Sequence, residues 1–207
     1  ATVASLLVAA AWSTGAALAA AVGGARRRGT WVGAGLAVVL AVVAGNLAAG
    51  RDAVDRLLGG PLGPYAWWEL SRLNPPTADI DEFPAWSILF GDPHPHLLWA
   101  PIAVAAVGIA VAYLGERSAE AADRPPSAVA TALAVALGAI CGWSRVAHAW
   151  DVPVTIAIVL ATTAGGALVG ARPARDRART SALHLALAAA VAALVAAPDV
   201  SRSQAFD

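Results

Sequence analysis

The sequence predicts an all-α, polytopic membrane protein with about six transmembrane helices, and three observations support this. Of the 207 residues, 58% are hydrophobic and only 14% are charged. Soluble domains carry about 25% charged residues, so a soluble domain of this length would need far more polar surface. The apolar residues fall into six runs, each close to the ~20 residues that cross a bilayer. We therefore treat residues 1–207 as a single membrane domain.

The charge and cysteine content exclude several other classes of protein. Fourteen Arg balance fourteen Asp plus Glu, and there is no Lys, so the net charge is zero and no nucleic-acid partner is indicated. The single cysteine, Cys141, cannot form an internal disulfide, and no Cys/His zinc spacing occurs. The chain also lacks methionine, which leads us to expect a processed or partial piece of a longer protein.

Six apolar runs are the predicted membrane spans. They are Val3–Val22, Trp31–Ala49, His96–Leu114, Ser127–Ser144, Val152–Ala171 and Thr180–Ala197. The first run resembles a signal peptide, but its basic cluster, Arg26 to Arg28, follows the apolar stretch instead of preceding it, which favours a span. His184, near one end of the sixth span, is predicted to be a packing residue.

The arginines predict the orientation of the spans. Nine of the fourteen lie in the connections that follow spans one, three and five, where only four of the fourteen acids lie. The positive-inside rule places these connections in the cytoplasm. We therefore expect a multi-pass protein of the cell membrane, with both termini and the long loop at residues 50–95 on the non-cytoplasmic side. Six tryptophans near this outer face are typical of an interfacial aromatic belt: Trp67, Trp68, Trp86, Trp99, Trp143 and Trp150.

The outer loop, residues 50–95, carries most of the polar chemistry. It is about 45 residues long, and loops of that length in compact proteins are usually functional or disordered. Its seven prolines and many aromatic residues favour a folded cap of short helices and turns on the membrane. Its acids and imidazoles gather between Asp79 and His96.

Three interpretations of the loop remain open. In the first, Asp92 before Pro93 is a helix N-cap that starts the third span. In the second, Asp92, His94 and His96 hold a divalent metal, because mixed oxygen and nitrogen ligands suit Mn²⁺, Mg²⁺ with waters, or Zn²⁺. In the third, Glu82 or Asp92 is a general base whose pKa is tuned by a partly shielded position.

A second outer constellation lies where span four ends and span five begins. If the helix of span four continues to His148, then Arg145 and His148 lie three residues apart on one face. These residues are either interface anchors, with Asp151 as an N-cap before Pro153, or an anion site in which arginine binds a phosphate. The candidate substrate-binding residues of the outer face are Arg72, Arg145, His148, Trp150 and Asp151.

Three ordered motifs carry a resemblance to a known family. The string from Glu82 to His96, followed by an apolar span with Pro101, resembles the signature of the YYY-type membrane proteins, also called domain of unknown function family 2298. The segments Trp67–Arg72 and Ala149–Pro153 resemble two further family motifs. The sequence departs from the family at three positions: Pro93, where Leu is usual, and His148 and Ala149, where Asn-Ser is usual. Family members are much longer, so the resemblance implies that this chain covers part of the usual protein.

The resemblance also implies an activity. The family is similar to the polytopic glycosyltransferases of the C superfamily, which take a sugar from a polyprenyl-phosphate donor and use an acidic residue on an outer loop. By this likeness, Asp92 or Glu82 deprotonates the acceptor or holds Mn²⁺ or Mg²⁺, with His94 and His96 assisting. The same likeness makes a membrane lipid, a polyprenyl phosphate, the expected partner.

Two other classes of function are weighed against a transferase. A short, Ala-rich chain of six spans also fits a structural or assembly subunit of a larger membrane complex, whose partners are other membrane subunits. A transporter is less favoured, because the span interiors contain almost no ionisable residues, which transport pathways usually carry near the midplane.

Overall fold

The protein is all-helical in the part of the chain that the structure describes. This computed structural model describes residues 2–23, 27–43, 58–59, 95–123, 125–147 and 149–203, and no strand occurs in these ranges. The helices are α1 (Thr2–Gly23), α2 (Arg27–Val38), α6 (Pro95–Ala119), α7 (Ala128–Ala147), α8 (Val152–Leu168) and α9 (Ala174–Ser203). A π-helical turn, η1 (Val39–Val43), follows α2, and a 3-10 turn, η2 (Ala149–Asp151), precedes α8. The predicted cap of the outer loop lies outside the described residues, apart from positions 58, 59 and 95.

The helix lengths confirm a polytopic membrane protein. Four helices, α1, α6, α7 and α9, are long and apolar enough to cross a membrane. Two more are apolar but shorter, over Arg28–Val42 and Val152–Leu168. The 17 residues of α8 extend about 25 Å at 1.5 Å per residue, slightly less than the ~30 Å hydrocarbon core. Each predicted span therefore corresponds to a helix, and the two shorter helices are the less complete spans.

The fifth span ends three residues earlier than the sequence predicts. We predicted a span as far as Ala171, whereas α8 stops at Leu168 and Val169 is extended. Gly170 has a φ of 98°, a conformation that favours glycine, and a Cβ there would lie 2.5 Å from the carbonyl oxygen of Arg117. The chain thus turns sharply against α6 instead of completing another helical turn.

The sixth span begins six residues before its predicted start at Thr180. The helix α9 starts at Ala174, directly after Pro173, whose carbonyl accepts hydrogen bonds from the backbone N–H groups of Asp176 (3.0 Å) and Arg177 (3.1 Å). An acid in the first turn also interacts favourably with the positive end of the helix dipole. The predicted connection between spans five and six is therefore largely the first turns of α9.

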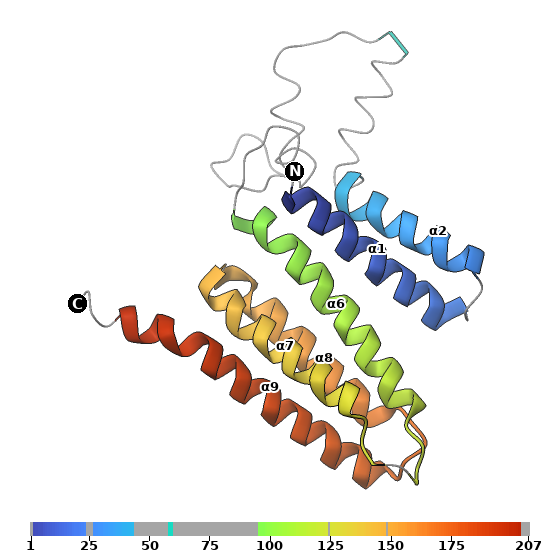
Figure 1. Ribbon diagram of the computed structural model, residues 1–207, viewed down its shortest axis with the longest axis vertical. Helices are drawn as coiled ribbons and strands as arrows, with labels where there is room; N and C mark the ends of the chain where they lie inside the picture. Colours follow the sequence, from blue (N-terminus) through green and yellow to red (C-terminus); the bar gives the residue numbers. More distant parts are fainter. Residues whose placement is uncertain are drawn as a thin grey trace.

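The helices form a four-helix group with a helical hairpin at its side (Figure 1). In the group, α7 packs on α9, α6 packs on α7 and α8, and α8 packs on α9. The hairpin of α1 and α2 joins the group chiefly through the contact of α1 with α6. The bundle core contains Ala106, Leu137, Val159 and Ala188, one residue from each of α6 to α9. Small residues thus allow close packing of apolar helices, as is usual in membranes.

The contact of α7 with α9 predicts a strong effect of one added methyl group. A Cβ at Gly138 would lie 2.7 Å from the Cα of Ala188, well inside the ~3.5–4.0 Å contact distance of carbon atoms. We expect Gly138→Ala to lower the free energy of unfolding by about 1–3 kcal/mol, because α7 and α9 must separate. Gly115→Ala is the matched control, since nothing lies within 4 Å of its added Cβ. Equal losses of thermal stability in detergent for the two variants would contradict this packing.

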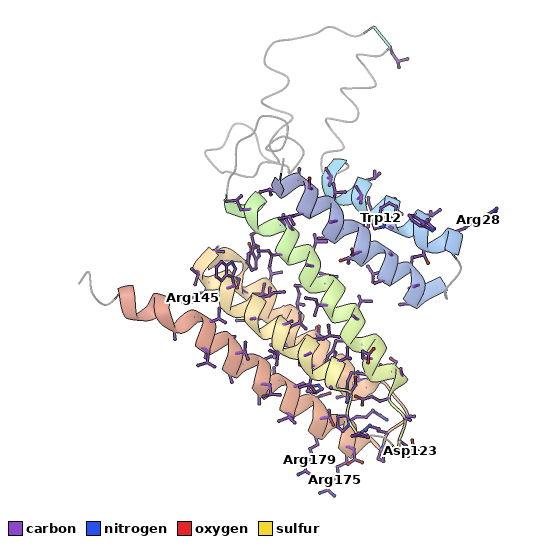
Figure 2. The ribbon with its side chains drawn as sticks, in the orientation of Figure 1. Trp12, Arg28, Asp123, Arg145, Arg175 and Arg179 are labelled. Atoms are coloured by element: carbon purple, nitrogen blue, oxygen red, sulfur yellow. The ribbon has the colours of Figure 1, made fainter. Side chains whose placement is uncertain are left out.

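The three Arg-rich connections lie at one end of the bundle. Figure 2 shows Arg28 of α2, Asp123 of the α6–α7 connection, and Arg175 and Arg179 of α9 on this side, with Arg145 at the other end. We call the end of the bundle that carries Arg28, Asp123, Arg175 and Arg179 the Arg-rich end. The helices alternate in direction, so the connections that follow the first, third and fifth spans lie at the same end, as the distribution of arginines predicts. The cytoplasmic position of the Arg-rich end stays a prediction from the positive-inside rule.

Candidate functional site

The start of α6, the end of α7 and the start of α8 lie at the end of the bundle opposite the Arg-rich end (Figure 1). The helix α6 begins at Pro95, α7 ends at Ala147, and α8 begins at Val152 after the turn η2. We call this the motif end, because α6 starts at Pro95, within the predicted motif Glu82–His96. The fold therefore connects that motif to the same end of the bundle as the second predicted constellation.

Hydroxyl groups fix the corner between α7 and α8. Ser144 Oγ lies 3.0 Å from Thr155 Oγ1 and donates to the carbonyl oxygen of Cys141 at 2.7 Å. Thr155 Oγ1 also lies 3.1 Å from the carbonyl oxygen of Asp151. Both hydroxyls are buried, and their mutual bond joins the last turn of α7 to the first turn of α8. The backbone around the turn η2 is therefore held in one geometry.

Asp151 occupies the N-cap position of α8, with Pro153 in the first turn. Its backbone has φ −86° and ψ −6°, and its side chain makes no capping hydrogen bond. An aspartate at an N-cap normally accepts such a bond from the second or third N–H of the helix. The predicted position at the helix start is confirmed, but the carboxylate is not used to cap the helix.

Arg145 lies in the last turn of α7, and its side chain is exposed. A guanidinium near the C-terminal end of a helix interacts favourably with the helix dipole. The helix ends at Ala147, one residue before His148. His148 lies outside the described residues, so the predicted pairing of Arg145 with His148 on one helical face stays a prediction.

The other predicted site residues are not placed by the structure. Glu82, Asp92, His94 and Arg72 lie outside the described residues, as do the side chains of His96 and Trp150. Within the described ranges, no group of three or more His, Cys, Asp or Glu residues could hold a metal ion. The side chains of the predicted metal ligands are not among those that the structure describes, so the metal site stays a prediction.

Trp99 is a buried residue of the motif end that the sequence analysis assigned to the interface belt. Its exposed fraction is 2%, whereas Trp143, also at this end, is 52% exposed. Trp99 is spaced by sevens from the buried Ala106 and Tyr113, so it shares the face of α6 that packs on α7. Its Nε1 has no hydrogen-bond partner among the described residues. A buried donor of this kind destabilises the fold unless something accepts its hydrogen.

A charged cluster is buried at the Arg-rich end. Glu120 Oε2 accepts a hydrogen bond from Arg117 Nη1 at 2.5 Å and lies 3.3 Å from Arg172 Nε. Glu120 Oε1 accepts the backbone N–H of Ser127 at 3.0 Å. The exposed fractions of Arg117, Glu120 and Arg172 are 1%, 8% and 9%. One carboxylate therefore joins the end of α6 to both neighbouring connections.

Two guanidinium groups bind carbonyl oxygens at the C-terminal end of α8. Arg117 Nη2 lies 3.3 Å from the carbonyl oxygens of both Gly166 and Arg177. Arg177 in turn donates to the carbonyl oxygen of Ala167 at 3.1 Å and to that of Gly170 at 3.3 Å. The last carbonyls of a helix have no partner within the helix, and cations near them are stabilising. These arginines fix the connection from α8 to α9.

A comparison with protein-family models gives one family. The model described as uncharacterized membrane protein (DUF2298) matches residues 1–205. This chain belongs to the DUF2298 family. The match covers nearly all of the chain, well beyond the motifs that carried the resemblance. Searches of curated proteins and of solved structures found no match.

The structure of this DUF2298 protein also shows a polar contact inside the bundle. His184 of α9 is buried, with Nδ1 2.9 Å from Tyr113 Oη and Nε2 3.0 Å from Thr131 Oγ1. Both ring nitrogens therefore have partners, which confirms the predicted packing role. The burial of Glu120 together with two arginines at the Arg-rich end was not predicted from the sequence.

Proposed function

We propose that this DUF2298 protein is a membrane glycosyltransferase of the C-superfamily type that uses a polyprenyl-phosphate sugar donor at the motif end. The observation that carries the proposal is a pair of hydrogen-bond donors at this end. Trp99 has a buried indole N–H without a partner among the described residues, and the side chain of Arg145 is exposed. A phosphate supplies acceptors for both groups.

The proposed reaction uses the acids of the motif as its base. A carboxylate, Asp92 or Glu82, takes the proton from the acceptor hydroxyl, and that oxygen attacks the anomeric carbon of the sugar. The bond from this carbon to the phosphate oxygen breaks, so that the polyprenyl phosphate leaves with the electron pair. Arg72 and Arg145 bind the phosphate by charge-assisted hydrogen bonds.

A divalent metal is part of the proposal. One carboxylate and two imidazoles, from Asp92, His94 and His96, form a donor set that suits Mn²⁺ better than Mg²⁺, which prefers oxygen ligands. The metal would neutralise charge on the phosphate when bound. The three residues fall within five positions at the start of α6, which begins at Pro95 and includes His96, so the start of that helix would position the site.

Removal of one hydrogen-bond donor tests the proposed role of Trp99. We expect Trp99→Phe to weaken binding of a fluorescent polyprenyl phosphate in detergent by about tenfold, because a hydrogen bond to a charged group contributes about 1.5–3 kcal/mol. Trp143→Phe is the matched control, since that indole belongs to the same end but is exposed. Equal affinities for both variants and the parent would show that the indole N–H does not contact the lipid phosphate.

The activity itself is tested with purified protein in proteoliposomes. The assay follows transfer of labelled sugar from a polyprenyl-phosphate donor to water-soluble acceptors supplied on the side of the motif end. Loss of transfer in Asp92→Ala or Glu82→Ala supports the proposal, and full transfer in both variants refutes the assignment of the base. Protein without transfer that always purifies with a fixed ratio of another membrane protein supports an assembly subunit instead.

A further inference from the structure

Two arginines at the start of α9 have no partner within the described part of the chain. Arg175 and Arg179 are exposed, and neither makes an ion pair or a side-chain hydrogen bond with another described residue. Figure 2 shows both at the Arg-rich end of the bundle. Arg117 and Arg177 at the same end differ, because their guanidinium groups are bonded to carbonyl oxygens of the fold. We call Arg175 and Arg179 the outer arginine pair.

The outer arginine pair can converge on one anion. The two residues are four positions apart on a helix, which places their Cβ atoms about 5–6 Å from each other. Like charges at this spacing repel, whereas one phosphate group accepts hydrogen bonds from both guanidinium groups. Asp176, the acid in the first turn of α9, is exposed and pairs with neither arginine among the described residues. The three exposed side chains together therefore remain positive.

The face of α9 that carries the pair continues as an exposed apolar stripe. Steps of three and four residues from Arg179 lead to exposed residues, namely Leu183, Ala186, Ala190 and Leu194. The opposite face carries the buried His184 and Ala188. Because α9 is apolar and long enough to cross a membrane, the exposed stripe faces lipid. Leu183 follows Arg179 by one turn, or about 6 Å, which is close to the ~5–8 Å thickness of one headgroup layer. The pair therefore lies at headgroup level, with lipid chains beside the next turn.

We propose that the outer arginine pair binds the headgroup phosphate of an anionic glycerophospholipid. Charge complementarity selects the headgroup, because each arginine near a membrane surface favours an anionic lipid about fivefold. Phosphatidylcholine also has a phosphate, but its own cation compensates the charge. The apolar stripe below the pair selects a lipid over a soluble phosphate, since acyl chains bury their surface against it. This site lies at the Arg-rich end and does not depend on the function proposed for the motif end.

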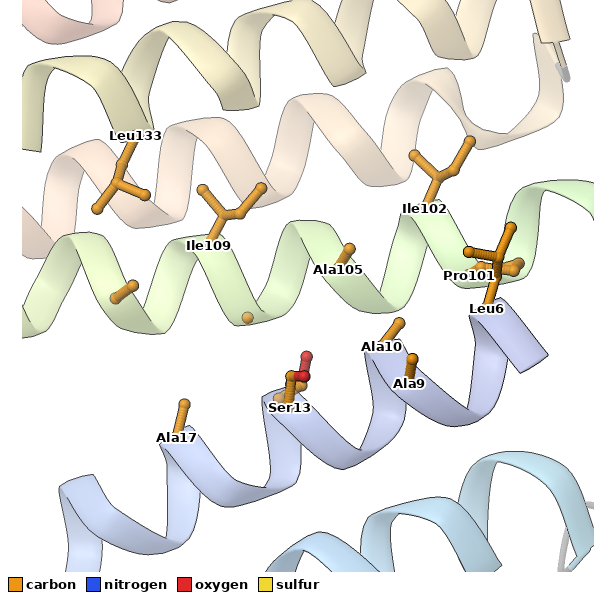
Figure 3. Close-up of a pocket in the computed structure, with 13 residues that line it drawn as sticks. Leu6, Ala9, Ala10, Ser13, Ala17, Pro101, Ile102, Ala105, Ile109 and Leu133 are labelled. Atoms are coloured by element: carbon orange, nitrogen blue, oxygen red, sulfur yellow. The ribbon is translucent and has the colours of Figure 1, made fainter. Parts of the chain in front are cut away.

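The groove between α1 and α6 provides a comparison surface (Figure 3). Its volume is about 570 Å³, and no charged side chain is among the described residues that line it. Its polar lining consists of the hydroxyl residues Ser13 and Thr14, and Thr14 is already bonded to the carbonyl oxygen of Val104. A groove without charge should not distinguish anionic from zwitterionic headgroups. Ala105→Leu, which fills this groove, is therefore a control variant.

Native mass spectrometry of the full chain tests the proposal. The purified protein is equilibrated in mild detergent with equal amounts of phosphatidylglycerol and phosphatidylcholine, and the ratio of the two bound lipids is measured. We expect the unmodified protein to favour phosphatidylglycerol, and the double variant Arg175→Gln, Arg179→Gln to lower the ratio about 25-fold, about fivefold for each arginine. Asp176→Asn should raise the ratio, because it removes a negative charge beside the pair. Ala105→Leu should leave the ratio unchanged.

Arg28→Gln separates the pair from the general positive charge of this end. Arg28 is also exposed at the Arg-rich end, but it belongs to α2. If Arg28→Gln lowered the ratio as much as Arg175→Gln, net charge alone would explain the preference and the site would be refuted. An unchanged ratio in the double variant would also overturn the proposal. Displacement of bound phosphatidylglycerol by inorganic phosphate would identify a soluble anion as the ligand and overturn the lipid.

Discussion

Replacement of Glu120 by glutamine is expected to lower the free energy of unfolding by about 3–5 kcal/mol, the largest stability effect that we predict. The Glu120 carboxylate bonds Arg117 and lies 3.3 Å from Arg172, and all three side chains are buried or nearly so. Without that charge, two guanidinium groups remain close together in a poorly hydrated site. Removal of one partner from a buried ion pair is costly because the other charge is left uncompensated. Unfolding in detergent, followed by heat or denaturant, measures the effect.

Asp123→Asn is the control for this charged cluster. Asp123 belongs to the same connection but is exposed, so its replacement should change the free energy of unfolding by no more than about 0.5 kcal/mol. High salt should weaken exposed ion pairs much more than this buried one. If Glu120→Gln and Asp123→Asn had the same small effect, the buried cluster would not hold the Arg-rich end together.

The largest expected effect on activity comes from Asp92→Asn. We expect sugar transfer to fall by about 10²–10⁴-fold, because the amide can neither accept the acceptor's proton nor contribute the same charge to a metal. Binding of the polyprenyl phosphate should persist, since Arg72 and Arg145 supply the cations for it. Asp79→Asn, in the same loop but outside the Asp-Pro-His-Pro-His string, is the control.

Chelation separates the two roles proposed for Asp92. If the residue holds a metal, EDTA should abolish transfer by the unmodified protein, and Mn²⁺ should restore it. If Asp92 is only the general base, EDTA should have no effect while Asp92→Asn remains inactive. Normal transfer by Asp92→Asn, with or without EDTA, would contradict both roles.

The sequence was sufficient for the class of fold and for the six apolar helices among the described residues. Apolar runs near the length of a bilayer predict spans because lipid satisfies no backbone polar group. The distribution of arginines also predicted correctly which connections share one end of the bundle. The ends of helices were less predictable, since the stop at Leu168 depends on a turn at Gly170 that packs against Arg117, a distant residue in sequence.

The buried polar residues could not be predicted from local pattern. Trp99 lies in an almost wholly apolar run, where no alternation of polar residues marks the face that packs inward. Its spacing by sevens from Ala106 and Tyr113 was the available signal. The contact of Glu120 with Arg172 joins residues 52 positions apart, which only the packing of α6 beside α8 brings together. The i,i+3 spacing of Arg117 and Glu120 was visible, but this spacing is also common on exposed helices.

The most direct test of the proposed function is native mass spectrometry of the gently solubilised protein, with Arg145→Ala and Asp92→Asn measured beside it. We expect a bound polyprenyl phosphate on the unmodified protein, reduced occupancy in Arg145→Ala, and retained lipid in Asp92→Asn. Absence of such a lipid from all three proteins, with another membrane subunit retained in fixed ratio, would contradict the transferase and identify an assembly protein.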